Sequence, residues 1–90
     1  MIVTLEEMKQ YLRVDFDDDD SIIETLITSA TRLCMDITRQ NEDVFEESEN
    51  AKPAVYYAVA YLYEHREEAD HHALTLTLRS LLFGSRKEAF

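Results

Sequence analysis

Four consecutive aspartates, Asp17 to Asp20, are the densest set of metal-ligand side chains in the 90-residue sequence. Divalent cations such as calcium prefer several carboxylate oxygens, so the run could hold one. Calcium loops, however, alternate their ligands with other residues and turn at a glycine, whereas this run is contiguous and contains none. The pattern therefore favours a structural role, in which Asp19 or Asp20 caps the following helix and the other carboxylates stabilise its positive end.

Three histidines, His65, His71 and His72, form a second group of possible metal ligands, here for zinc. No two of them have the spacing of a metalloprotease pair, and a structural zinc site would need four ligands. The one cysteine, Cys34, is far away in sequence and falls on the apolar stripe of a predicted helix. The sequence therefore favours solvated histidines and a Cys34 that is inert core packing.

No acid–base pair, phosphate-binding loop or metal spacing rises above background, so we expect neither catalysis nor a cofactor. Nine Lys and Arg against nineteen Asp and Glu give a net charge of −10, which opposes tight binding to a polyanion such as DNA. A single cysteine and no signal-peptide-like start favour the reducing cytoplasm. The longest apolar run, Ala54 to Tyr63, is about half the roughly twenty residues of a membrane span, so no membrane segment is expected.

That apolar run is the most informative feature, because ten consecutive apolar residues place hydrophobic side chains on every side of a helix. Either this helix is central and surrounded by the others, which is slightly favoured, or one of its faces contacts another polypeptide. Its tyrosines suit the second alternative, since tyrosine is enriched at interfaces. Helical spacing pairs Tyr56 with Tyr63 on one face and Tyr57 with Tyr61 on another, and either pair could be the contact.

One Gly and one Pro are too few for the turns of a many-stranded protein, so the predicted class is all-α. We expect a single domain over residues 1–90, a small bundle of about four helices. Thr4 and Glu7 have the spacing of a capping box and begin a short helix that runs to about Leu12. A sustained pattern of threes and fours predicts a long amphipathic helix over residues 21–38.

The second half contains two more predicted helices. The tyrosine helix covers residues 52–67 with Pro53 in its first turn. The last helix covers residues 73–83 and stops at Gly84; the leucines expected to face inward are Leu74, Leu78, Leu81 and Leu82. Alternation over residues 74–78 would also suit a strand, but the sequence offers no partner strand. An acidic loop near residues 39–52, pinned by Val44 and Phe45, and a short tail at 85–90 complete the chain.

Several of these patterns occur together in one order. They are the stretch from Thr4 to Asp15, the aspartate run followed by Ile22 and Ile23, the helix from Pro53 to Glu67, and a closing Leu81-Leu82 pair followed by Arg86. This order resembles the tailed-phage head-tail connector, or adaptor, family over nearly the whole chain. Each piece is a common helix pattern, and the resemblance rests on the order in which the pieces follow one another along the chain.

The resemblance implies a non-enzymatic structural protein of a phage or prophage, located in the virion neck after assembly in the bacterial cytoplasm. It would form a homo-oligomeric ring of roughly twelve subunits, closed by contacts between two different faces of each subunit. Its partners would be the portal protein and a tail-completion or stopper protein. DNA would pass through the ring without sequence-specific binding, because an acidic wall repels it.

The candidate interface residues are Tyr56, Tyr57, Tyr61, Tyr63, Arg66, Arg79 and Arg86. Surplus apolar area on a small domain could be buried in such contacts between subunits. The alternative function is a small acidic helical interaction module, such as a dimeric regulator or an antitoxin-like partner that binds a basic protein. The same composition and helix pattern suit both.

Overall fold

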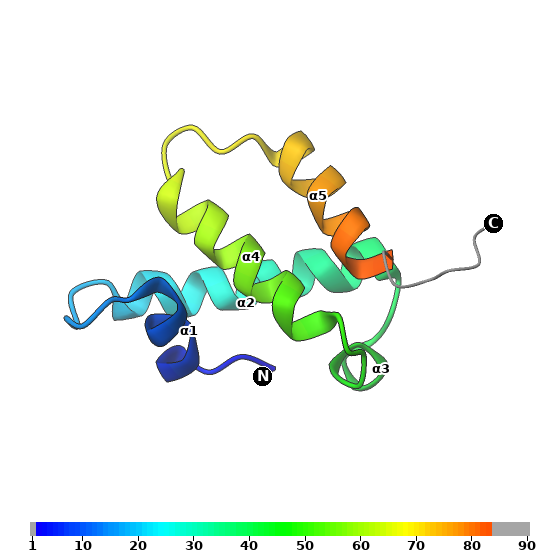
Figure 1. The fold of residues 1–90 in the computed structure, drawn as a ribbon, viewed down its shortest axis with the longest axis horizontal. Coiled ribbons are helices and arrows are strands. Elements are labelled where there is room, and N and C mark those ends of the chain that lie inside the picture. Colours follow the sequence, from blue (N-terminus) through cyan, green and yellow to red (C-terminus); the bar gives the residue numbers. More distant parts are fainter. Residues whose placement is uncertain (1, 84–90) are drawn as a thin grey trace.

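The computed structural model describes residues 2–83, which form five α-helices and no strand (Figure 1). They are α1 (Leu5–Leu12), α2 (Asp20–Thr38), α3 (Glu42–Glu46), α4 (Ala51–Glu64) and α5 (His71–Phe83). The predicted all-α bundle is confirmed. Gly84, the tail at 85–90 and Arg86 lie outside the described residues.

Helices α2 and α4 together form the centre of the bundle, because each of them contacts all four other helices. Helix α4 lies across α2, with α5 running back beside it and α1 packed at the end where α2 begins (Figure 1). Three of its five fully buried residues are alanines, and small side chains let helices approach closely. The core lies mainly between α2, α4 and α5; its residues on these helices are Ile23, Ile27, Ala30, Cys34, Ala51, Ala54, Val55, Ala58, Val59, Leu74, Leu78 and Leu82.

The first helix begins with the capping box that its sequence predicts. The Thr4 hydroxyl accepts a hydrogen bond from the Glu7 backbone N–H at 3.1 Å, and the Glu7 carboxylate accepts one from the Thr4 N–H at 3.1 Å. Lys52 of α4 reaches the same carboxylate at 3.1 Å, so the cap is also a contact between α1 and α4. These contacts, the Thr4 hydrogen bond first, lower the pKa of Glu7.

The second helix begins differently from the expectation. Asp19 is the residue at the N-cap position, but its side chain makes no capping hydrogen bond, and Asp20 is already in the first turn. The Asp19 carboxylate instead accepts from Tyr63 of α4, and the Asp20 carboxylate pairs with Lys9 of α1. The prediction of side-chain capping by Asp19 or Asp20 is therefore wrong.

The expected acidic loop contains a short helix, α3, and its last two residues belong to α4. Asn41 begins α3, since its side-chain oxygen accepts a hydrogen bond from the Val44 N–H at 3.0 Å. Phe45 is fully buried, whereas Val44 is 49% exposed, because neighbours on one helical turn point in different directions. Phe45 therefore anchors this segment, and the matching prediction for Val44 is wrong.

Three predictions for the second half of the chain are wrong: the end of α4, the start of α5 and the burial of Leu81. Helix α4 ends at Glu64 and not near Glu67, because the chain turns after it and the Tyr61 hydroxyl accepts a hydrogen bond from the Asp70 N–H at 3.0 Å. Asp70 in turn accepts from the Ala73 N–H at 3.0 Å, so α5 begins at His71, two residues earlier than predicted. Leu74, Leu78 and Leu82 face inward as expected, but Leu81 is 38% exposed.

Candidate assembly surface

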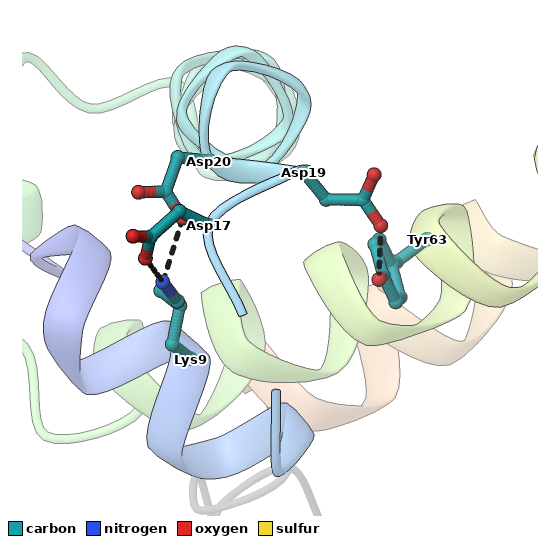
Figure 2. A network of polar contacts seen from close by, with 5 residues as sticks. All are labelled: Lys9, Asp17, Asp19, Asp20 and Tyr63. Carbon is teal, nitrogen blue, oxygen red and sulfur yellow. Dashed lines mark hydrogen bonds and ion pairs between the residues drawn. The ribbon is translucent and has the colours of Figure 1, made fainter. Parts of the chain in front are cut away.

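The aspartate run is a junction between three helices (Figure 2). On one side, Lys9 of α1 lies 3.0 Å from an Asp17 oxygen and 2.7 Å from an Asp20 oxygen. The hydrogen bond with Asp20, followed by that with Asp17, raises the pKa of Lys9. The Lys9 side chain is only 15% exposed, so its charge is largely enclosed by these carboxylates.

On the other side of the junction, the Tyr63 hydroxyl of α4 donates a hydrogen bond of 2.6 Å to Asp19 (Figure 2). This bond is the main reason that the pKa of Tyr63 is raised, because the phenol donates only while it is protonated. The linker between α1 and α2 is therefore fixed to α1 through Lys9 and to α4 through Tyr63. Within residues 2–83, no group of three or more His, Cys, Asp or Glu side chains has an arrangement that could hold a metal ion.

Three of the four α4 tyrosines have partners within the chain. The Tyr56 ring stacks on Tyr11 of α1, with 4.8 Å between ring centroids. The Tyr61 ring stacks on His65 at 4.2 Å, and its hydroxyl holds the start of the connection to α5. Tyr63 bonds Asp19 as described. All three are half-buried, so neither predicted pair is wholly core, and their rings mainly join α4 to its surroundings.

Tyr57 differs from the other three, because it is 37% exposed and no ring contact or hydrogen bond of its side chain is seen among the described residues. Of the candidate cations, Arg66 lies over the Tyr63 ring, with its guanidinium carbon 5.1 Å from the ring centroid. Arg79 is exposed on α5, and Arg86 is not described. Of the candidate interface residues, Tyr57 and Arg79 are therefore the most accessible to a partner among those described.

Cys34 and the histidines follow their predicted environments. Cys34 is fully buried on α2, and this burial raises the pKa of its thiol to about 12, which keeps it unreactive at neutral pH. His65, His71 and His72 are exposed. The structural role that the sequence assigns to Cys34 agrees with this burial.

The structure also exposes apolar side chains that sequence reasoning missed. Tyr11 and Phe16 are each 51% exposed, Ile22 is 40% exposed and Leu76 is 53% exposed. Phe16 had a signal in the sequence, since a large aromatic residue among aspartates in a linker has no helix to bury it. The others required knowledge of which helix face the neighbours cover.

Exposed aromatic side chains on a small helical domain are typical of the class of proteins that act through contacts with other proteins. Comparison with protein families identifies the chain more narrowly: residues 2–88 match the phage gp6-like head-tail connector proteins. The chain belongs to this family. No curated protein and no solved structure matches it.

The expected resemblance to head-tail connectors is therefore confirmed, and with it a structural role in joining phage head and tail. Among residues 2–83, no helix has both the length and the apolar character that crossing a membrane would require.

Proposed function

We propose that this chain forms a ring of roughly twelve copies below the portal of the DNA-filled head and receives a tail-completion or stopper protein on its other side. The observation that carries the proposal is the family match, which extends over residues 2–88. The ring acts in the virion neck, after assembly in the bacterial cytoplasm. It has no catalytic role: its work is to hold two larger assemblies together.

The surface of the subunit supports this function. Helix α4 already contacts the four other helices, and Tyr57 remains exposed, so its ring is not needed for the packing of the monomer. Tyrosine is among the residues that contribute most to interfaces when a partner covers it. We therefore assign Tyr57, together with Arg79, to contacts with a neighbouring subunit or with the portal.

The net charge of −10 supports passage of DNA without tight binding. Binding to duplex DNA depends on Lys and Arg side chains that neutralise phosphates, and a strongly acidic chain has few of them to spare. Titration of labelled duplex with the chain at low salt should give no saturable binding. Tight binding that weakens steeply with added salt would contradict this part of the proposal.

Native mass spectrometry of the chain mixed with the portal protein of the same phage tests the assembly. We expect one ring of many copies for each portal. Tyr57→Glu should abolish the ring and leave a folded monomer, because a charge cannot be buried at the contact. Tyr57→Phe is the matched control and should assemble normally. A defined dimer that ignores the portal would instead support a small helical regulator.

A further inference from the structure

The α1–α2 linker exposes one aromatic side chain from a segment of backbone that is held in place. Phe16 is 51% exposed and lies between Asp15 and Asp17. This segment is held in place because Asp17 is paired with Lys9 and Asp19 is hydrogen-bonded to Tyr63, as Figure 2 shows. Because the backbone that carries Phe16 is already ordered, binding costs little further conformational entropy, so this side chain is suited to insertion into a partner.

Further along α2, the surface is hollowed. The hollow has a volume of about 330 Å³ and is lined by Thr28, Thr31, Arg32, Met35 and Glu42. Its size is at the lower end of natural ligand pockets, which are roughly 300 to 1,000 Å³. The Met35 thioether favours contact with an aromatic ring, and Arg32 has no ion pair within residues 2–83. The hollow thus suits an aromatic side chain accompanied by a carboxylate.

Phe16 cannot fill the hollow of its own chain. Thr28, the lining residue nearest to the start of α2, is eight residues beyond Asp20, which is about 12 Å along a helix that rises 1.5 Å per residue. Phe16 lies on the far side of Asp20, in a linker that is fixed to α1 and α4. The only copy of Phe16 that could reach the hollow belongs to another molecule.

We propose that Phe16 of one subunit inserts into the α2 hollow of the next, with Asp15 facing Arg32. The proposal rests on the ring assembly proposed above and names the contact that builds it. The two surfaces are different, one in the α1–α2 linker and the other on α2, so the contact is heterologous and can repeat until a ring closes. Glu42 also lines the hollow and opposes the incoming carboxylates, so it should weaken the contact.

Cross-linking between subunits tests this contact even if it is weak. A chain with Asp18→Cys and Thr28→Cys keeps Phe16, Asp15 and Arg32, and a short bismaleimide should join it into a ladder of oligomers. Cys34 does not compete, because it is buried. Adding Phe16→Ser should remove the ladder, whereas adding Leu76→Ser, at a side chain of similar exposure (53%), should leave it. A ladder that survives Phe16→Ser, or no ladder at all, would overturn the proposal.

Mixing two defective variants gives an independent test. Phe16→Ser retains an intact hollow and Arg32→Glu retains an intact Phe16, so each should self-associate about tenfold or more weakly than the parent chain. Together they share one intact contact and should form 1:1 pairs but no longer chains. Glu42→Gln should strengthen self-association. Pairs that do not form in the mixture would contradict the heterologous contact.

The two proposals fail differently. If rings form on the portal and Phe16→Ser leaves them unchanged, the contact is wrong and the ring function stands. If the parent chain never forms rings, but the two variants pair and the ladder depends on Phe16, the contact is right and the ring function is wrong.

Discussion

At the scale of single residues, four identical side chains in one run have different roles. Asp17 and Asp20 hold Lys9, Asp19 accepts from Tyr63, and Asp18 is exposed. Composition and spacing favour a structural role for the run, but they assign that role to the α2 backbone. The partners of the run belong to other helices, and in the case of Tyr63 the partner is 44 residues away. Only tertiary packing brings them together.

The hydrogen bond between Tyr63 and Asp19 should be measurable as stability. Tyr63→Phe removes only the hydroxyl and should lower the free energy of unfolding by about 0.5 to 1.5 kcal/mol in urea titrations. Tyr57→Phe is the control and should change it little. Because the folded-state pKa of Tyr63 is raised above 10.0, the contribution is present below that pH and is lost as the pH rises further. Equal effects of the two substitutions would contradict a specific role for this bond.

The contacts of Glu7 should make the stability of the chain depend on pH in the acidic range. The pKa of Glu7 is lowered from 4.5 by the Thr4 backbone and by Lys52, so the folded chain binds this proton less readily than the unfolded chain. The stabilisation is therefore complete above the unfolded pKa and is lost as the pH falls through the folded one. Urea midpoints measured from pH 7 downwards should fall less steeply for Glu7→Gln than for the parent chain. Parallel curves would show that the contacts of Glu7 do not stabilise its charge.

At the scale of helices, the long amphipathic pattern of α2 is predicted almost to the residue, because one face of it is continuously buried. Helix α3 is missed because five residues are too few to show a period, although Asn41 three residues before Val44 is a usable cap signal. The end of α4 is misplaced because Tyr61 fixes the following turn through Asp70, a contact between residues that hydrophobic spacing does not reveal.

Two helices end on arginines in the left-handed region, Arg13 at φ 63° and Arg39 at φ 58°. Glycine usually occupies this position, since a side chain makes the conformation unfavourable by roughly 1 to 2 kcal/mol. The sequence has only one glycine, at residue 84, so these ends are strained. Arg13→Gly or Arg39→Gly should therefore raise the free energy of unfolding by about 0.5 to 1 kcal/mol, after the entropy cost of glycine.

Alanine variants at the same positions distinguish the relief of backbone strain from the loss of the arginine charge. Arg13→Ala and Arg39→Ala remove the same charges but retain a Cβ atom, so they should give no comparable gain. Thermal or urea unfolding of the four variants provides the comparison. If alanine stabilises as much as glycine, the effect belongs to the arginine charge and not to the backbone.

At the scale of the whole molecule, α4 lies at the centre of the bundle together with α2 and also carries an exposed tyrosine. The sequence poses these as alternatives, because a uniformly apolar helix does not indicate how many neighbours surround it. In the fold, α4 contacts all four other helices, and Tyr57 still remains exposed. The hollow on α2 could not be predicted at all, since one of its lining residues, Glu42, belongs to the unexpected helix α3.

The most direct measurement of the central claim is cryo-electron microscopy of DNA-filled heads after addition of this chain. We predict a ring of symmetric density directly below the portal, into which α1 to α5 fit as rigid bodies, with Tyr57 or Phe16 at a boundary between molecules. Heads that show no added density at the portal, or density elsewhere on the capsid, would contradict a function as the connector between head and tail.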